Sequence, residues 1–319
     1  MKVLVTGGSG FIGSHLVKKL VERGIKVRIY DLIYPDFLED TSNVEYYQGS
    51  LLEYDRLRLA MGTTDYVFHL AAVAYVKDVY EEPKYAEAIN VRGTFNVLEA
   101  ARTLGRIKRV IYASTIWVYS DTKGNLLDEN SPLSPPSHLY TATKIMGEYY
   151  CKSYYELYKV PYTILRFGIP YGPRARQEGV VPTFIRKALN GEPLTIAGDG
   201  MQYRKFVYVE DLAEGCVLAL KKIAKNKVYN LEGDEKITIK QIAETIQKIL
   251  GKVEINYIEG RPGDFCGKEI SNELAKKELG WYPKTSFDEG IRKYIDWYRH
   301  KLEMEKAEEQ RIEKILSKI

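Results

Sequence analysis

The first half of the chain alternates short apolar runs with longer amphipathic stretches, and this alternation constrains the fold more than any other feature. The amphipathic stretches predict helices at residues 11–22, about 83–104 and 139–158. The short runs predict buried strands at residues 3–5, 27–30, 44–47, 66–70, 108–113 and 162–166. This order favours an α/β fold with a doubly wound parallel sheet. Ligands bind such sheets at the carboxyl ends of the strands, where we expect Gly7, Asp31, His69, Thr115 and Arg166.

A glycine-rich segment from Thr6 to Gly13 follows the first predicted strand and opens the first predicted helix. Glycine permits a tight turn and lets the backbone approach a pyrophosphate, while a helix N-terminus offers free N–H groups. Asp31 ends the next predicted strand, where a carboxylate accepts bonds from an adenosine ribose diol and repels a 2′-phosphate. We therefore expect a Rossmann-type site for NAD rather than NADP.

The composition changes after Phe167, because proline and glycine become frequent from 170 to 200. We expect residues 1–168 to form the NAD-binding domain and 206–231 to join it, since 206–209 and 228–231 look like strands that could return to the sheet. Residues 169–205 and 232–298 are expected to form a smaller α/β substrate-binding domain. Residues 299–319 predict a charged C-terminal helix, with either one docked face or an oligomer contact on the stripe Leu302, Ala307, Ile312, Leu316 and Ile319.

The bulk composition suits a folded enzyme or binding protein of two packed regions. The chain has 319 residues, of which 45% are hydrophobic and 28% charged, and its net charge of +4 indicates neither nucleic acid nor a membrane surface as partner. It has no signal-peptide core and no run of 18 apolar residues, so we expect a cytoplasmic protein. Cys151, Cys216 and Cys266 form no CxxC pair and are expected to be buried thiols, and the four histidines predict no metal site.

A tyrosine and a lysine one helical turn apart, Tyr140 and Lys144, provide the main catalytic signal. A nearby ammonium lowers the pKa of a phenol, which makes the phenolate a usable base. The same spacing occurs at three other places, including Tyr155 and Lys159. Only Tyr140 and Lys144 follow a strand that ends in Ser114 and Thr115, whose hydroxyls can bond the same substrate oxygen. His69 ends a buried strand, and a structural role is expected for it.

With these motifs the chain resembles the extended short-chain dehydrogenases/reductases, in the branch of nucleotide-sugar epimerases and dehydratases, and within it the UDP-glucose 4-epimerases most. The resemblance covers about residues 1–298. It rests on the glycine-rich segment and on motifs that lie, in order, at residues 69–72, 90–94, 114–115 with 118–119, 140–144, 171–174, 198–200, 204 and 261–264.

The resemblance implies a catalytic set in which Tyr140 is the base, Thr115 orients the reacting hydroxyl and Lys144 also holds the nicotinamide ribose. It implies that Arg204 and Arg261 clamp the diphosphate of a nucleotide sugar, in agreement with the fit of guanidinium to phosphate. It also implies a homodimer, formed through helices 83–104 and 139–158. The residues expected to contact NAD are Gly7, Gly10, Phe11, Ile12, Gly13, Asp31, Leu51, Leu70, Ala71, Ala72, Asn90, Tyr140 and Lys144.

Several positions depart from the pattern of the family. The dehydratases carry Asp-Glu after the catalytic Thr, where this chain has Ile116 and Trp117, so dehydration is disfavoured, as is decarboxylation. Ile169 stands where epimerases carry an Asn that faces the sugar nucleotide. Lys268 falls near the position that limits sugar bulk, and it could bind a substrate carboxylate, bond the diphosphate or reach solvent.

The sequence therefore predicts an NAD-dependent nucleotide-sugar epimerase, acting at C4 of a UDP-hexose through a 4-keto intermediate. The alternatives are a reductase of a 4-keto nucleotide sugar that uses NAD(P)H, a UDP-uronate 4-epimerase that uses Lys268, and a non-catalytic scaffold that senses dinucleotides.

Overall fold

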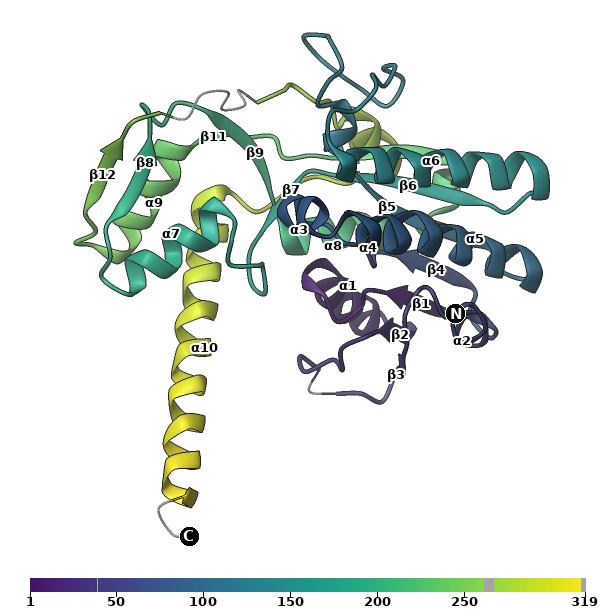
Figure 1. Cartoon of the computed structure of the whole chain (residues 1–319), viewed down its shortest axis with the longest axis horizontal. Coiled ribbons are helices and arrows are strands. Elements are labelled where there is room, and N and C mark those ends of the chain that lie inside the picture. The colour runs from purple at the N-terminus through teal and green to yellow at the C-terminus, as the bar shows by residue number, and fades with distance from the viewer. Residues whose placement is uncertain (39, 261–266, 317–319) are drawn as a thin grey trace.

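The computed structural model describes residues 1–38, 40–260 and 267–316. Its larger part is a parallel seven-stranded sheet in the order β10-β6-β5-β4-β1-β2-β3 (Figure 1). The chain reverses its direction of winding between β1 and β4, where sheets of this kind bind ligands. The strands are β1 (Lys2–Thr6), β2 (Lys26–Asp31), β3 (Val44–Gln48), β4 (Tyr66–His69), β5 (Arg109–Thr115), β6 (Tyr162–Phe167) and β10 (Lys227–Leu231).

Helices cover both faces of this sheet, as the sequence predicts for a doubly wound fold. In β1, Val3 and Val5 pack into one buried cluster and Leu4 into the other, because alternate residues of a strand point to opposite faces. The first cluster is completed by α1 (Phe11–Glu22) and α8 (Val209–Leu218). The second is completed by α2 (Tyr54–Met61), α5 (Gly93–Leu104) and α6 (Leu139–Tyr158).

Two of the three predicted helices, α1 and α6, span the predicted residues. The third, predicted at 83–104, is a helical run in three parts, since the π-helical turn η1 (Ala88–Arg92) separates α4 (Pro83–Glu87) from α5. A π turn of this kind is often found at a functional site. The shorter helical connections are α3 (Val76–Glu81), η2 (Ile116–Tyr119), η3 (Lys222–Ala224) and η4 (Ala275–Leu279).

The smaller part contains two small sheets and three longer helices, seen to the left of the large sheet in Figure 1. One sheet has the order β11-β9-β7 and the other pairs β12 with β8. A separate apolar cluster holds the sheets and helices together. The strands and helices of the smaller part are β7 (Ile169–Tyr171), β8 (Leu194–Ala197), β9 (Tyr203–Tyr208), β11 (Lys236–Thr238), β12 (Ile255–Ile258), α7 (Val180–Leu189), α9 (Ile239–Leu250) and α10 (Phe287–Leu316).

The prediction that strands 206–209 and 228–231 return to the large sheet is right for one of the two. The second strand is β10, which pairs in parallel with β6. The first corresponds to β9, which instead pairs with β7 and β11 in the smaller part. The division of the chain into domains at the predicted boundaries stays a prediction.

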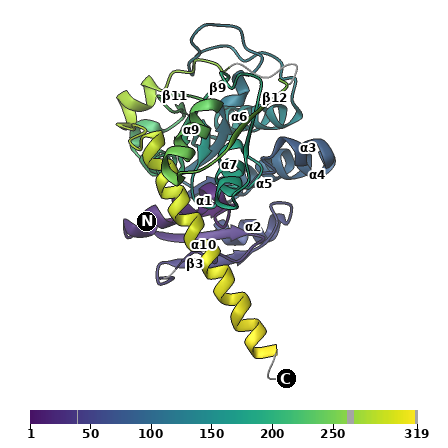
Figure 2. The same cartoon turned by 90° about the vertical axis from the view of Figure 1, so that its left-hand side faces the viewer.

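The predicted C-terminal helix 299–319 does not begin where the sequence suggests, because α10 runs without a break from Phe287. Its first turns are buried through Ile291 and Ile295, whereas residues 303–314 are all exposed. This half projects away from the body in both views (Figures 1 and 2), so the docked face expected on Ala307 and Ile312 is not observed. No helix among the described residues has the length and apolar content needed to cross a membrane.

Candidate active site

The glycine-rich loop lies between β1 and α1, with Gly7 in the left-handed region at φ +72° and its N–H bonded to Tyr30 O. A Cβ at Gly7 would lie 2.7 Å from Ala71 N, and one at Gly13 would lie 2.0 Å from Gly7 O. Larger residues therefore cannot replace these two glycines without moving the backbone. The loop keeps the close backbone approach and the open helix N-terminus that a pyrophosphate needs, so the residues present fit NAD.

Asp31 closes the same loop from the end of β2. Its carboxylate accepts bonds from Ser9 N at 2.9 Å and from Ile33 N at 3.2 Å. The side chain is half-exposed, so its oxygens can also accept from a ligand. The structure thus brings Asp31 to the loop where the sequence predicts the adenosine ribose.

The segment after β4 packs against the same loop. Leu70 N and Ala71 N both donate to Thr6 O, which fixes residues 70–72 beside the glycines. Ala72, Phe11 and Ile12 are half-exposed at this edge.

Two residues that the resemblance assigns to the cofactor are engaged within the protein. Leu51 is only 4% exposed, and a Cβ at Gly93 would lie 2.9 Å from its Cβ. The Asn90 amide bonds both backbone groups of Val73, at 2.8 and 2.9 Å, and donates to Thr143 Oγ1 at 3.1 Å. Asn90 therefore ties the π turn to α6 and to the loop after β4.

His69 has the structural role that the sequence predicts. Its two ring nitrogens lie 2.9 Å from the hydroxyls of Thr6 and Thr94. Burial, with a smaller contribution from the Lys144 charge, lowers the pKa of His69 to about 3. The ring is therefore neutral at physiological pH, and the two threonines hold it between β1 and α5.

The predicted catalytic set comes together at the end of β5 and the start of α6. Thr115, Tyr140 and Lys144 are all buried, and the Thr115 side chain lies close enough to the Tyr140 hydroxyl to oppose the rise of its pKa. Lys144 Nζ donates to Ala113 O at 2.9 Å and lies 5.2 Å from the centre of the Tyr112 ring. The structure thus places the hydroxyl, the phenol and the ammonium within one small region.

The expectation that the ammonium lowers the pKa of the phenol is wrong for this arrangement. Burial raises the pKa of Tyr140 to about 12, and only the nearby Thr115 side chain opposes the shift. The Lys144 ammonium is directed to Ala113 O instead, and burial lowers its own pKa to about 8. Tyr140 is therefore a neutral phenol here, which can donate or accept a hydrogen bond.

A buried ion pair, which the sequence indicates only weakly, supports the strand that carries Thr115. Glu148 and Arg166 are each 2% exposed and form a two-pronged contact at 2.7 and 2.9 Å. Ser114 Oγ donates to Glu148 at 2.6 Å, and Arg166 also bonds the hydroxyl of Tyr119. The available signal was that Glu148 lies one helical turn beyond Lys144.

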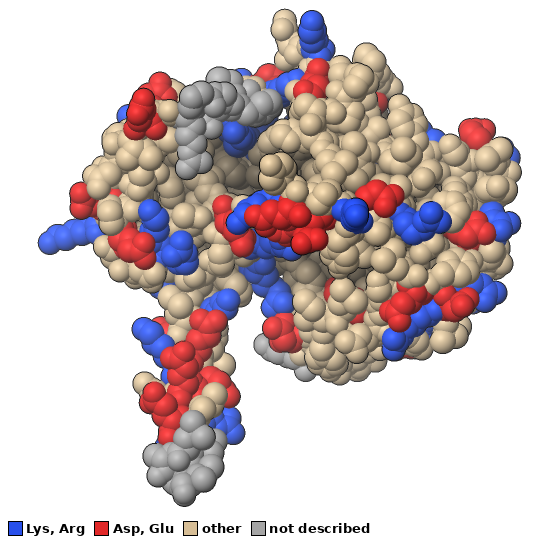
Figure 3. Space-filling model, viewed as in Figure 1, with Lys and Arg blue, Asp and Glu red and all other residues tan. Residues whose placement is uncertain are grey.

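A pocket opens directly after Thr115, between the sheet and the smaller part. It encloses about 410 Å³, part of which is open to solvent. Figure 3 shows the surface hollowed between these two parts, with basic side chains at the edge of the hollow. The described residues that line the pocket are Ile116, Trp117, Ser120, Ile169, Arg204, Lys205, Glu232, Gly267, Lys268 and Ile270.

The predicted substrate residues behave differently in this pocket. Arg204 lines it and donates from Nη1 to Tyr203 O at 2.8 Å. Arg261 lies outside the described residues. Lys268 also lines it, but its ammonium donates to the carbonyls of Tyr119 and Thr122, at 2.9 and 2.6 Å. None of the three roles suggested for Lys268 includes these two hydrogen bonds, which hold the segment at the end of η2 in place.

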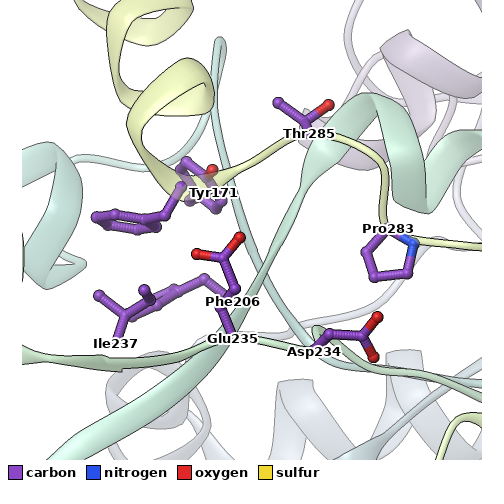
Figure 4. Close-up of a pocket in the computed structure, with 8 residues that line it drawn as sticks. Tyr171, Phe206, Asp234, Glu235, Ile237, Pro283 and Thr285 are labelled. Carbon is purple, nitrogen blue, oxygen red and sulfur yellow. The ribbon is translucent and has the colours of Figure 1, made fainter.

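A second, smaller pocket lies in the smaller part, next to the start of α10 (Figure 4). Glu235 directs its carboxylate toward Tyr171, while Asp234 points away from that ring. Asp234 is occupied by Asn272 at 2.8 Å and Lys276 at 3.0 Å. None of the predicted site residues lines this pocket, so we place the active site in the pocket beside Thr115.

Comparisons with known proteins identify the family of this chain. Residues 3–231 match the model of the NAD dependent epimerase/dehydratase family. A dTDP-D-glucose 4,6-dehydratase of Bos taurus is 32% identical over 98% of this chain and 92% of its own length.

Two solved structures are also similar. The UDP-glucose 4-epimerase of Thermotoga maritima with UDP-glucose has a TM-score of 0.87 and 33% identity, covering 95% of this chain and 100% of that one. The UDP-glucuronic acid 4-epimerase of Bacillus cereus, in complex with UDP-glucuronic acid and NAD, has a TM-score of 0.86 and 31% identity, covering 94% and 99%. The chain therefore belongs to the NAD dependent epimerase/dehydratase family, and it is an enzyme that uses NAD as its cofactor.

Proposed function

We propose that this enzyme epimerises a nucleotide sugar at C4, with a UDP-hexose such as UDP-glucose as substrate. The observation that carries the proposal is the pair Ile116 and Trp117, which follows Thr115 directly and lines the pocket. Neither side chain transfers protons, whereas loss of water from C5 and C6 needs an acid and a base there. The groups next to Thr115 therefore favour a reaction confined to one carbon.

The catalytic set supplies the proton chemistry of that reaction. Thr115 would orient the 4-hydroxyl, and Tyr140 would take its proton, since the two side chains are buried close together. Bound NAD supplies a hydride acceptor and a positive charge, and such a charge favours the phenolate. Lys144 would hold the nicotinamide ribose. After the 4-keto sugar turns over in the pocket, the hydride would return to the opposite face of C4 and Tyr140 would return the proton to the 4-oxygen.

The nucleotide part of the substrate would lie toward the smaller part. Arg204 supports this assignment, because it lines the pocket and a guanidinium suits a diphosphate. Lys268 gives little support to a uronate substrate, because two carbonyls already accept from its ammonium.

The test is to purify the protein, measure retained NAD, and supply UDP-glucose or UDP-galactose without added cofactor. The reaction is redox-neutral, so we expect interconversion, followed by NMR of the products. Activity only with stoichiometric NAD(P)H would identify a reductase, and a 4-keto-6-deoxy product would identify a dehydratase. The absence of turnover and of ligand-dependent NAD chemistry would favour a sensing scaffold.

We also propose a homodimer formed through α5 and α6. The exposed face of α6 is unusually apolar for a surface helix, with Met146 42%, Tyr149 56% and Leu157 71% exposed. Burying such a patch is a common reason for association. Light scattering of the wild type and of Tyr149→Glu tests this, and a monomeric wild type would refute it.

A further inference from the structure

Glu232 carries a carboxyl in the proposed substrate pocket, and no sequence motif predicts a role for it. It directly follows β10, which is an edge strand of the large sheet and pairs with β6. Its carboxyl packs against Gly168, where a Cβ would lie 2.6 Å from Glu232 Oε1. It lines the same pocket as Ile116 and Trp117. The fold therefore brings Glu232 to the cavity that opens beside Thr115.

Glu232 is buried, and it has no ion-pair partner among residues 1–38, 40–260 and 267–316. It is 1% exposed, and its carboxyl accepts a bond from Gly233 N at 2.9 Å. Within the described part of the chain, no lysine or arginine nitrogen lies within 4.0 Å of it. The nearest basic group on β9, Lys205, pairs with Glu269 at 3.1 Å. A buried carboxyl with so few partners is unfavourable unless something else bonds to it.

The charges around Glu232 act in both directions. The pKa of Glu232 is raised to about 8, mainly by burial; the nearby carboxylates Glu269 and Asp234 also raise it, while the Gly233 N–H and Lys205 lower it. The other cations of the pocket are Arg204, which donates to Tyr203 O, and Lys268, which donates to two carbonyls. At neutral pH Glu232 is therefore largely a neutral acid, which can donate and accept hydrogen bonds.

We propose that Glu232 contacts the sugar of the bound nucleotide sugar and, in its ionised form, selects an uncharged hexose over a uronate. The proposal rests on the assignment of this pocket to the sugar. A hexose hydroxyl satisfies either form of the carboxyl, because a hydroxyl both donates and accepts. A uronate carboxylate can bond to the neutral acid, but it is repelled once Glu232 is ionised. Selection against the uronate must therefore grow stronger as the pH rises.

The experiment is calorimetric titration of the NAD-loaded enzyme with UDP-glucose and with UDP-glucuronate, at about pH 6.5 and about pH 9. The ratio of the two dissociation constants removes every effect on the shared UDP group. In the wild type we expect the preference for UDP-glucose to increase by about tenfold or more between these pH values, as like charges meet in a partly desolvated site.

The matched variants are Glu232→Gln, which keeps the shape but cannot ionise, and Glu129→Gln, which removes a carboxyl outside the pocket. Glu232→Gln should make the ratio independent of pH, and Glu129→Gln should behave as the wild type. A wild-type ratio that does not change with pH would overturn the proposal without any variant. An unchanged pH dependence in Glu232→Gln would overturn it as well. Epimerisation is assayed separately, so binding that behaves as expected without epimerisation would refute the proposed reaction alone.

Discussion

Replacing Lys144 by Met should stabilise the NAD-free protein near neutral pH while it abolishes activity. Lys144 is 4% exposed, and burial alone lowers its pKa to about 8 from the ordinary 10.5. Its charged form is therefore less stable in the folded protein than in the unfolded chain. We expect this lysine to be retained for its role toward the cofactor, at the expense of folding.

The pKa difference sets the size of the effect. A fall from 10.5 to about 8 corresponds to about 3 kcal/mol of folding free energy, at about 1.4 kcal/mol for each pKa unit. The substitution also removes the hydrogen bond to Ala113 O, which contributes about 1 kcal/mol. Lys144→Met should thus gain about 2 kcal/mol at about pH 7.

The advantage must disappear at high pH. Between pH 8 and 10.5 the unfolded chain holds more protons at Lys144 than the folded protein, so the wild type gains stability as the pH rises through this range. Above it the penalty is gone, and Lys144→Met should be about 1 kcal/mol less stable because only the lost hydrogen bond counts.

The assay is urea denaturation of cofactor-free wild type and variant across this pH range. Lys152→Met, an exposed lysine on the same helix, is the control and should show no pH-dependent difference from the wild type. Two results would contradict the burial penalty on charged Lys144: a Lys144→Met variant less stable than the wild type at about pH 7, or a stability difference between the two that does not depend on pH.

Three further substitutions test other parts of the site. Tyr140→Phe should lower turnover by roughly 10²–10⁴ with NAD retained, while Tyr155→Phe does almost nothing; equal losses in steady-state kinetics would show that the base is misassigned. Asp31→Ala should weaken NAD more than NADP in equilibrium titrations, and a wild type that prefers NADP would contradict the role of this carboxylate. Glu148→Leu should cost about 3–5 kcal/mol in urea denaturation, because it leaves Arg166 buried without its partner, and should be rescued by Arg166→Met; a loss below about 1 kcal/mol would contradict the pair's structural role.

The large sheet and the full lengths of α1 and α6 could be predicted from the sequence, because the patterns that mark them lie within short segments of the chain. Glycines at Gly7 and Gly13 mark the first turn, and apolar periodicity marks α1 and α6 over their full length. The assembly of Thr115, Tyr140 and Lys144 also follows, since the end of β5 and the start of α6 are fixed by the order of the elements.

The remaining features depend on tertiary contacts between distant parts of the chain. No local pattern places Glu232 against Gly168, because the contact requires β10 to lie beside β6. The tie between Lys268 and the carbonyl of Tyr119 joins residues 149 positions apart. The pKa of Tyr140 was mispredicted for a related reason, since spacing on a helix does not show where the Lys144 ammonium points.

The exposed half of α10 has a consequence for how the protein moves in solution. Residues 303–316 extend about 20 Å at the usual rise of an α-helix, so they lengthen the particle far more than they add to its mass. Residues 303–314 are held mainly by backbone hydrogen bonds and by exposed ion pairs such as Lys301–Glu305. Isolated helices of such length are marginal in water. Amide protons along α10 should therefore exchange with solvent slowly near Ile291 and rapidly beyond Leu302. The frictional coefficient of the protein should show how much of the exposed half of α10 is helical at a given temperature.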